Sequence, residues 1–311
     1  MSDTPAPQPF PVICGPTASG KTGLAVGVCE ALAERGKPGE VVSADAFQVY
    51  RELDIASAKP TADERRGIPH HLIDVVDIAS RFTVAQWLRL AEAAIADIRG
   101  RGGVPVVVGG THLYIKSLLD GLFDAPEPDA EVRAAVAAMD PADRRAELER
   151  LDPEAAARIH PNDDRRTIRA IEVVRQTGTP ITELQSQWDR DQPSRADRRL
   201  VILHRETDEL NGRINARVKQ MIADGLLAET KALADRLGPT AREALGTKQM
   251  LRHLAGEWTL DEAIERTKIE TRRFAKNQRT WMRRLAAHKN TLSLRPDDTD
   301  AAERVIEVMA L

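Results

Sequence analysis

One stretch near the N-terminus has the residue types and the spacing of a phosphate-binding loop. Residues 15–22 read GPTASGKT and fit the pattern G-x-x-x-x-G-K-[ST] at every fixed position. The glycines let successive backbone N–H groups turn inward around an anion, and Lys21 adds a positive charge. The Thr22 hydroxyl is suited to holding a hydrated Mg²⁺ ion, which we expect as the cofactor. The expected diphosphate- or nucleotide-binding residues are Gly15, Pro16, Thr17, Ala18, Ser19, Gly20, Lys21 and Thr22.

Two further polar positions follow apolar runs and are expected to face the same ligand. Asp45 ends the β-branched run 40–44, and Thr111 follows a Gly-Gly pair after the apolar run 104–108. Because the carboxyl ends of parallel strands meet at one edge of a sheet, both should lie beside the phosphate loop. An Asp at a strand end is commonly a turn or cap residue, which is the alternative interpretation of Asp45. The run 104–108 lacks the terminal acid that holds magnesium in nucleotide hydrolases, which argues against an ordinary ATPase.

The stretches that carry these residues alternate between strand and helix patterns. Apolar runs typical of strands recur at 10–14, 40–45, 72–76 and 104–108. Between them lie helical stripes, such as the one that begins after Thr83 and repeats apolar residues as far as Ile98. This alternation predicts an α/β fold in which a parallel sheet is flanked by helices.

After residue 124 the pattern changes. Residues 125–198 hold helical patterns without a convincing strand, and a strand pattern returns at 200–203. We therefore predict a core of residues 1–124 and 199–311 with an inserted all-helical lobe at 125–198. The longest helix is expected from Asp261 to about His288, before a short strand at 291–294 and a last helix. The apolar positions assigned to the long helix are Ile264, Phe274, Trp281 and Leu285.

Composition limits the class of protein. The chain has 311 residues, of which 42% are hydrophobic and 30% charged, as is ordinary for a soluble globular protein. No stretch approaches the roughly 20 apolar residues of a membrane span, and the N-terminus has no apolar signal core. Cys14 and Cys29 lie in apolar patterns, so buried thiols are expected rather than a disulfide or a zinc site. We expect a cytoplasmic monomer that does not interact with membranes.

The net charge of −3 conceals a strongly basic segment. Residues 264–289 hold nine basic and two acidic side chains, a local charge of +7. A second basic group lies in the predicted lobe and consists of Arg158, Arg165, Arg166 and Arg169. Solvated charged faces are the ordinary explanation of such runs. Two basic clusters on separate lobes would also suit a phosphate backbone. In that case, the candidate RNA contacts in the basic segment 264–289 are Arg272, Lys276 and Arg279.

Several blocks of the sequence resemble one family. They are GPTASGKT (15–22), SADAFQVYRELDIASAKP (43–60), PHHLIDVVDI (69–78), PVVVGGTHLYIKSLLDGL (105–122), DPEAAARIHPNDDRRTIRAIEV (152–173), TGTPITELQ (177–185) and TRRFAKNQRTWMRR (271–284). In this order they are similar to the tRNA dimethylallyltransferases, also called tRNA isopentenyltransferases or IPP transferases. The phosphate loop alone is shared by many families, whereas SADAFQVYR, GGTHLYIK and IHPNDDRR are specific to this one.

The resemblance implies a reaction, a fold and a set of site residues. The reaction moves a dimethylallyl group from dimethylallyl diphosphate to the exocyclic amine of the adenosine 3′-adjacent to the tRNA anticodon, and releases diphosphate. The fold is a P-loop NTPase-like, nucleoside-kinase-like core with a helical lobe that grips the anticodon stem-loop. Asp45 matches the catalytic base, and Thr22 and Thr111 complete the catalytic set. The tRNA-side positions that it implies are Asp45, Ala46, Phe47, Gln48, Thr111, Arg133, Arg165, Arg166, Thr167, Ile168 and Arg169.

Four positions differ from the residue that the family often has. Ala46 stands in place of Ser, and Ala56 in place of Gly. Glu243 stands where Gln or Arg is frequent, and Asn277 where a basic residue is common.

Two other functions share some of these features. A small-molecule kinase would use the same loop and core, with ATP as the donor and Asp45 activating a hydroxyl group. An RNA-binding switch protein would bind ATP and RNA without forming a new covalent product. The destination of a labelled prenyl group separates all three.

Overall fold

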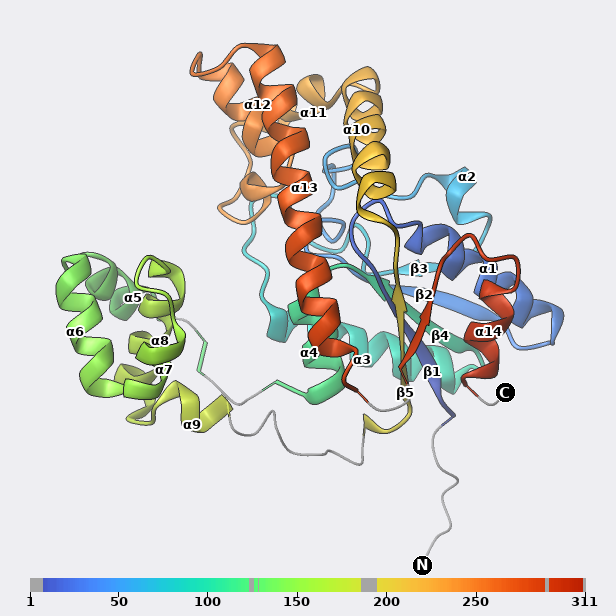
Figure 1. The fold of residues 1–311 in the computed structure, drawn as a ribbon, viewed down its shortest axis with the longest axis horizontal. Helices are drawn as coiled ribbons and strands as arrows, with labels where there is room; N and C mark the ends of the chain where they lie inside the picture. Colours follow the sequence, from blue (N-terminus) through green and yellow to red (C-terminus); the bar gives the residue numbers. More distant parts are fainter. Residues whose placement is uncertain (1–7, 123–125, 128, 186–194, 289–290, 310–311) are drawn as a thin grey trace, which may run out of the picture. The chain divides into compact units, whose positions relative to one another are not determined.

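A six-stranded parallel sheet organises the described residues of the N- and C-terminal parts of the chain (Figure 1). Across the sheet, the strands are β3 (His70–His71), β2 (Gly39–Ala44), β4 (Val104–Gly109), β1 (Phe10–Cys14), β5 (Arg198–Leu203) and β6 (Leu292–Leu294). Gly109 of β4 pairs with Cys14 of β1 on one side and with Ala44 of β2 on the other. The segments that follow these three strands therefore leave the sheet side by side. The predicted α/β class is confirmed.

The computed structural model describes residues 8–122, 126–127, 129–185, 195–288 and 291–309. The chain divides into two compact units, one formed by Met1–Leu119 with Ser194–Leu311 and the other by Asp120–Pro193. The boundary predicted between residues 124 and 125 lies outside the described residues, as does Lys289 of the basic segment. Within the described ranges, no helix is long and apolar enough to cross a membrane.

Helices cover both faces of the sheet. The flanking helices are α1 (Lys21–Glu34), α3 (Val84–Gly100), α4 (His112–Asp120) and α14 (Ala301–Glu307). Helices α1 and α14 share one apolar core with Ile13 and Val106 of the sheet. Because successive side chains of a strand point to opposite faces, the residues next to Ile13 and Val106 point to the other face of the sheet. On that face, Trp87 of α3 stacks on Tyr114 of α4 at 4.5 Å and donates to Ser43 O of β2 at 3.0 Å. These contacts fix α4, and with it the residue that precedes it, Thr111.

The remaining helices of this unit are α2 (Ala62–Arg65), α10 (Thr207–Ala223), α11 (Leu226–Leu233), α12 (Thr247–Leu254) and α13 (Leu260–Leu285). Of these, α10 and α12 pack against the long helix α13, α11 packs against α12, and α2 lies beside α1. The buried positions of α13 are Ala263, Thr267, Thr271, Ala275, Gln278, Met282 and Leu285. Of the four predicted apolar positions, Leu285 is buried, Ile264 and Trp281 are partly buried, and Phe274 is 37% exposed. Burial of threonine is tolerated because the Thr267 and Thr271 hydroxyls donate to carbonyl oxygens one turn earlier.

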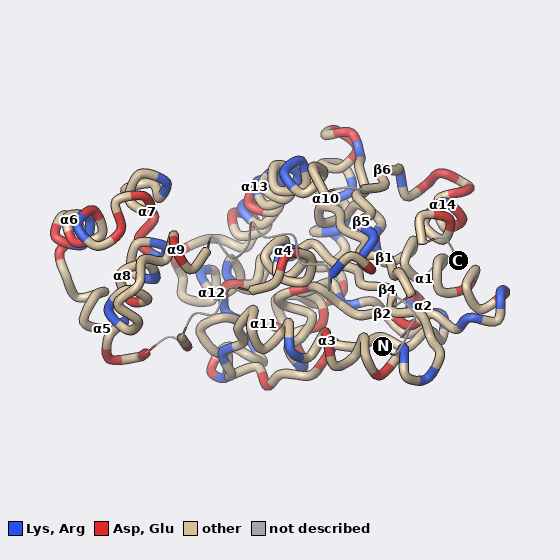
Figure 2. Tube along the Cα trace, turned by 90° about the horizontal axis from the view of Figure 1, so that it is seen from below, with Lys and Arg blue, Asp and Glu red and all other residues tan. Residues whose placement is uncertain are grey.

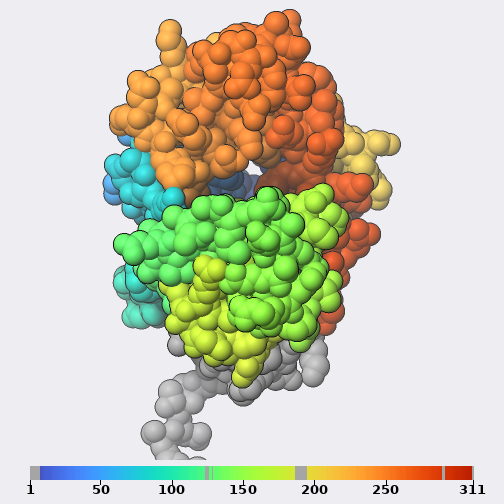
Figure 3. Space-filling view, turned by 90° about the vertical axis from the view of Figure 1, so that its left-hand side faces the viewer, coloured from blue at the N-terminus to red at the C-terminus, as the bar shows by residue number. Residues whose placement is uncertain are grey.

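The inserted unit is a group of helices with an apolar core of its own. Its helices are α5 (Ala130–Ala137), α6 (Pro141–Leu151), α7 (Pro153–Arg158), α8 (Asp164–Thr177) and α9 (Ile181–Gln185). The aspartates that cap helix N-termini are Asp129, Asp140, Asp152 and Asp163. Val136, Leu148 and Ile171 are fully buried in one cluster. The compact green-to-yellow body in Figure 3 is this unit, and its described residues include no strand.

The strand predicted at 72–76 is not formed. Pairing with β2 stops at His71, and Leu72 and Asp74 have φ angles of 62° and 58°, in the left-handed region that interrupts an extended strand. Val76 makes an isolated bridge with Tyr50. The apolar run therefore closes a loop instead of extending the sheet.

Candidate active site

The phosphate loop joins β1 to α1, and cationic side chains hold its carbonyl oxygens. The donors and acceptors are Lys21 Nζ to Pro16 O at 3.0 Å, Arg213 Nε to Ala18 O at 2.8 Å and Arg205 Nε to Ser19 O at 2.7 Å. Gly20 has a φ of 100°, in the left-handed region that favours glycine. The first amide N–H groups of α1 have no acceptor inside the helix, so they are available to an anion.

Besides Lys21 and Arg205, two arginines of α10 contact this loop. Arg213 and Arg217 lie one turn apart on α10, and Arg217 Nη1 donates to Thr17 Oγ1 at 3.3 Å. Burial and the charge of Arg217 lower the pKa of Lys21 to about 8. Burial and the charge of Arg213 lower the pKa of Arg217. An anionic ligand would relieve this repulsion. Neither arginine was predicted from the sequence, although a spacing of four residues places both on one face of a helix.

Asp45 acts as a turn residue and also faces the cavity. Its Oδ1 accepts from the backbone N–H of Phe47 at 2.9 Å and of Gln48 at 3.3 Å, as the alternative interpretation expected. The Gln48 side chain accepts from Ser43 Oγ at 3.1 Å and donates to Ala58 O at 3.3 Å. Within the described residues, Asp45 Oδ2 has no hydrogen-bond partner. One carboxylate oxygen is thus used for orientation, and the other is available for chemistry.

Thr111 lies next to Asp45 across the edge of the sheet. Its Oγ1 accepts from Ala46 N at 3.0 Å, and its own N–H donates to Ala44 O at 3.3 Å. Because the hydroxyl oxygen already accepts a hydrogen bond, its proton can point to a ligand. The structure therefore brings together the end of β2 and the turn after β4, as the sequence predicted.

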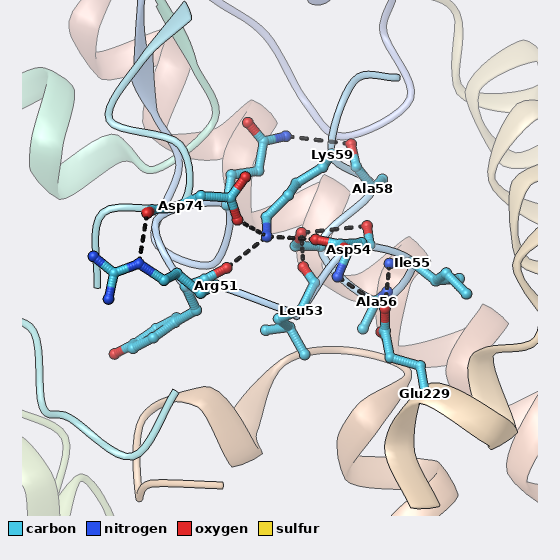
Figure 4. Close-up of polar contacts among 12 residues, drawn as sticks. Arg51, Leu53, Asp54, Ile55, Ala56, Ala58, Lys59, Asp74 and Glu229 are labelled. Atoms are coloured by element: carbon cyan, nitrogen blue, oxygen red, sulfur yellow. Dashed lines mark hydrogen bonds and ion pairs between the residues drawn. The ribbon is translucent and has the colours of Figure 1, made fainter. Parts of the chain in front are cut away.

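A loop between Tyr50 and Pro60 lines the same site, and Glu229 of α11 holds it from the side. Glu229 Oε2 accepts from the N–H of Asp54 at 2.8 Å and of Ile55 at 2.7 Å, and Oε1 accepts from that of Ala56 at 3.0 Å (Figure 4). A carboxylate that accepts from consecutive amides makes charge-assisted hydrogen bonds. This side chain comes from a helix far along the chain, and no local pattern identified it.

Lys59 holds the loop from within. Its side chain is only 5% exposed, and Nζ donates to Tyr50 O at 2.5 Å, Asp54 Oδ1 at 2.6 Å and Asp74 Oδ1 at 2.5 Å (Figure 4). The three ammonium protons are therefore all used. The left-handed turn at Asp74 is what brings its carboxylate to this lysine.

These segments surround one cavity of about 1430 Å³. One part of its wall is the phosphate loop with Arg213 and Arg217, and another is Asp45 with the loop that Glu229 holds. The apolar part of the wall includes Val218, Met221, Leu245 and Phe274. Three of the four positions that differ from the family pattern, Ala56, Glu243 and Asn277, also line the cavity, and Glu243 Oε2 accepts from Lys248 Nζ at 2.8 Å. The cavity offers cations, the carboxylate oxygen of Asp45 that the turn does not use, and an apolar surface.

The basic residues predicted in the inserted unit have different environments. Arg165 and Arg166 are exposed, and Arg166 pairs with Asp163 of its own helix. Arg133 and Arg169 both pair with Glu172, which is 0% exposed, at 3.1 and 3.3 Å. Among the other predicted positions, Thr167 is buried and Ile168 packs against the apolar cluster of this unit.

Lys and Arg recur along α13 (Figure 2). Two of the predicted contacts there have partners on α10, because Arg272 Nη1 donates to Asn215 Oδ1 at 2.7 Å and Arg279 Nη1 donates to Thr207 Oγ1. The side chain of Lys276 is exposed and has no polar partner within the described residues. This helix therefore carries both internal and solvent-facing cations.

Cation-binding groups at the site are limited to oxygen atoms. The described residues contain no group of three or more His, Cys, Asp and Glu side chains that could hold a metal ion. Thr22 and Asp45 line the same cavity, and a hydroxyl and a carboxylate are donors that suit Mg²⁺ with its water ligands. Cys14 and Cys29 are buried thiols, as predicted, and burial raises the pKa of each to about 12.

Comparison with known proteins places this site in a family. The sequence model of the IPP transferases matches residues 48–285. The chain belongs to the IPP transferase family. It is 46% identical over 279 residues to the tRNA dimethylallyltransferase of Anaeromyxobacter dehalogenans, a match that covers 88% of this chain and 91% of that protein. It is also 45% identical over 280 residues to the tRNA dimethylallyltransferase of Salinispora tropica, with 88% and 84% covered.

Solved structures of IPP transferases have the same fold. The chain superposes on the full-length tRNA isopentenylpyrophosphate transferase of Bacillus halodurans with a TM-score of 0.67 and 37% identity, covering 98% of this chain and 95% of that one. For a eukaryotic dimethylallyltransferase acting on tRNA, the TM-score is 0.80 at 29% identity, with 96% and 78% covered. The resemblance and the P-loop NTPase-like fold are confirmed. The family model matches from Gln48 onward and therefore does not include the phosphate loop or Asp45. The roles of these residues are argued from the geometry described above.

Proposed function

We propose that the chain transfers a dimethylallyl group from dimethylallyl diphosphate to the exocyclic amine of the adenosine 3′-adjacent to the tRNA anticodon. Membership of the IPP transferase family makes it a tRNA prenyltransferase. The observation that carries the assignment is one cavity that joins a complete phosphate loop, the carboxylate of Asp45 and an apolar wall. A diphosphate with a short hydrocarbon tail and an extruded base need these three surfaces.

The chemistry follows from the positions of these groups. As the amine nitrogen forms its bond to C1 of the donor, the C–O bond to diphosphate breaks and the diphosphate keeps the electron pair. Asp45 takes the proton that the nitrogen loses, through the oxygen that the turn does not use. Lys21, Arg217 and the loop amides stabilise the negative charge that develops on the leaving group. The products are N6-isopentenyladenosine in the tRNA and free diphosphate.

P-loop-type prenyltransferases of this family generally need a divalent metal ion. We assign Mg²⁺ to this role, with the Thr22 hydroxyl as a ligand and Asp45 on the same cavity wall. When bound, the ion supplies positive charge to the departing diphosphate. The protein supplies the remaining charge through Lys21, Arg213 and Arg217.

The tRNA contacts are assigned to two groups of residues. The first group, Ala46, Phe47, Gln48 and Thr111, follows β2 and β4, and its members Phe47 and Gln48 line the cavity. Away from it, the exposed cations are Arg165 and Arg166 on α8 and Lys276 on α13. The inserted unit grips the anticodon stem-loop in this proposal, and the protein works as a cytoplasmic monomer.

The direct test follows the prenyl group. The protein is mixed with Mg²⁺, dimethylallyl diphosphate labelled in the hydrocarbon and unmodified tRNA, and the tRNA is then digested to nucleosides. Label in N6-isopentenyladenosine is the expected result, and it should disappear when the target adenosine is replaced by guanosine. A kinase is not favoured by the family match. Release of inorganic phosphate from ATP that depends on Lys21, with no label in tRNA, would overturn the proposal.

A further inference from the structure

One buried side chain of α13 connects the two segments that serve the two substrates. Gln278 is 3% exposed, and its Oε1 accepts from Thr17 N in the phosphate loop at 2.8 Å. Its Nε2 donates to Gly110 O at 2.8 Å, in the residue that precedes Thr111. The carboxamide thus spans from the loop that faces the diphosphate to the turn that faces the acceptor base.

The fit around this carboxamide is tight. A Cβ placed on Gly110 would lie 2.4 Å from Gln278 Nε2, a separation at which one of the two groups must move. The bridge also needs an acceptor at one end and a donor at the other, which an amide has and a carboxylate or an alkyl group lacks. Glycine at position 110 and glutamine at position 278 therefore form a matched pair.

The bridge extends to the catalytic carboxylate by one further contact. Thr111 Oγ1 accepts from Ala46 N, and Ala46 follows Asp45. The path from Thr17 to Asp45 therefore consists of backbone and two long-range side chains, the carboxamide of Gln278 and the hydroxyl of Thr111. The same helix carries the exposed Lys276 two residues earlier.

We propose that Gln278 is a positioning residue that sets the separation between the phosphate loop and the turn carrying Thr111, and so the distance between donor and acceptor. This inference rests on the transfer reaction proposed above. Positioning acts on the rate of the bound complex, because a displacement of about 1 Å at the reacting atoms can cost about 10² in rate. It need not change how tightly either substrate binds alone.

The first experiment removes the bridge. Gln278→Leu keeps the approximate size and loses both hydrogen bonds, and Gln278→Glu keeps the acceptor and loses the donor. Both should lower the single-turnover transfer rate at saturating tRNA and donor by about 10². The dissociation constants of Gln278→Leu for tRNA alone and for inorganic diphosphate should stay within about threefold, whereas Gln278→Glu adds a negative charge beside the phosphate loop and should also weaken diphosphate binding. Since Gln278→Leu risks misfolding, Gln278→Glu and thermal unfolding of each variant keep the result interpretable.

A matched control is another buried glutamine of the same unit. Gln249 is 0% exposed, and its side chain joins Gly246 N at 2.8 Å to Glu270 Oε2 at 2.9 Å. Gln249→Leu should lower the unfolding temperature and leave the saturating transfer rate within about threefold. If Gln278→Leu likewise lowers only the unfolding temperature and leaves the saturating transfer rate within about threefold, Gln278 has a structural role alone and the proposal is overturned.

A second experiment tests the pair itself. Gly110→Ala should reduce the transfer rate and the unfolding temperature in the wild-type background, because the methyl group meets Gln278 Nε2. In a Gln278→Ala background, Gly110→Ala should lower the transfer rate and the unfolding temperature little further, since the obstructing Nε2 atom is gone. Gly109→Ala is the control, because its methyl group would lie 2.1 Å from Ala44 O, which Gln278→Ala leaves in place. If the decreases in unfolding temperature caused by Gly110→Ala and Gln278→Ala simply add in the double variant, the pairing is contradicted.

The outcomes separate this inference from the proposed function. If the wild-type protein transfers no label to tRNA, the proposed function fails, while the pairing of positions 110 and 278 is still read from unfolding temperatures. If the wild-type protein transfers label and Gln278→Glu does so within threefold of its rate, the positioning role fails alone. Loss of diphosphate affinity in Gln278→Leu with an unchanged saturating rate would also overturn it.

Discussion

At the scale of single residues, the two oxygens of Asp45 have separate environments. Oδ1 is held by two backbone N–H groups, and Oδ2 has no hydrogen-bond partner among the described residues. The turn therefore orients the carboxylate without consuming its ability to accept a proton. The sequence supported a turn residue and a catalytic base as alternatives, and in the structure one group can fill both roles.

Asp45→Asn should preserve the turn and abolish proton transfer. The amide oxygen of Asn can accept from the same two N–H groups, so the fold and most tRNA affinity should remain. The single-turnover rate should fall by about 10² to 10⁴, the usual contribution of a general base. The measurement uses saturating tRNA and donor at several Mg²⁺ concentrations. A loss that shrinks as Mg²⁺ rises would make Asp45 a metal ligand, and a rate within threefold of wild type would remove it from the chemistry.

Lys21 should give the donor step a pH dependence. Its pKa in the free protein is lowered to about 8, by burial first and by Arg217 second, so the side chain loses its proton as pH rises through about 8. A bound diphosphate raises that pKa, so binding takes up a proton above this pH and kcat/KM for the donor falls there. Lys21→Arg stays protonated and should lose this decline. Calorimetry of diphosphate binding in buffers of different ionisation enthalpy measures the uptake, and pH-independent binding by wild type would contradict it.

At the scale of elements, the loop 50–60 is shaped by side chains from outside it. Glu229 reaches it from α11, and Lys59 joins it to Asp74 after β3 (Figure 4). These contacts explain why the apolar run 72–76 is not a strand: the left-handed turns at Leu72 and Asp74 deliver the partner of Lys59. Periodicity reports how apolar residues recur, and it carries no information on such a polar network.

Glu229→Ala should destabilise the folded state by about 1–3 kcal/mol, since three backbone amides lose a charged acceptor. Glu257→Ala is the matched control, because Glu257 forms an exposed ion pair with Arg252 and its loss should cost less than about 1 kcal/mol. Urea unfolding of both variants measures the difference. Equal midpoints for the two variants would show that the loop does not depend on Glu229.

The exposed cations should contribute most to the salt dependence of tRNA binding. Arg165→Ala and Lys276→Ala should each reduce the log–log slope of affinity against salt by about 0.7 to 1, because each removes one phosphate contact. Arg35, which pairs with Glu303 on the face covered by α1 and α14, provides the control variant Arg35→Ala. Unchanged slopes for both Arg165→Ala and Lys276→Ala would show that these side chains are solvated and do not contact tRNA phosphates.

Arg133 and Arg169 should behave differently from those cations. Both neutralise the buried Glu172, so Arg133→Ala leaves a carboxylate short of one partner and should destabilise the inserted unit. The sequence placed Arg169 in a basic cluster, and the family resemblance implied Arg133, but neither showed their shared partner, because Glu172 is one apparently ordinary acid in a charged helix. Circular dichroism during thermal unfolding measures the effect. An unfolding temperature equal to that of wild type would contradict a structural role.

At the scale of the whole molecule, the fold was predictable where the signal was local. The phosphate loop, the ends of β2 and β4 and the helix capped by Thr83 all follow from short patterns. What could not be predicted depends on pairs far apart in sequence, such as Thr17 with Gln278 or Asp54 with Glu229. On α13 the buried stripe includes Thr267, Thr271 and Gln278, so a search for apolar residues could not find these positions.

The inserted unit should be removable without unfolding the rest. Its core is its own, and the chain leaves and re-enters the larger unit at points that are held together, since Arg195 Nη1 donates to Ser117 O at 3.2 Å and to Leu118 O at 2.6 Å. A short Gly-Ser linker in place of residues 120–193 should therefore leave a folded core that binds inorganic diphosphate within about threefold of wild type. The residues that line the cavity all belong to that core.

The same variant should lose transfer to tRNA, because the proposed grip on the anticodon stem-loop is gone. A loss of at least about 10² in kcat/KM for tRNA is expected, which corresponds to roughly 2.7 kcal/mol of lost transition-state binding. Diphosphate binding by calorimetry and label transfer to tRNA are measured on the same preparation. If diphosphate still binds and transfer persists within threefold, the inserted unit takes no part in holding tRNA. If diphosphate binding is lost with it, the two units are not independent, and the donor site depends on residues that the structure places outside it.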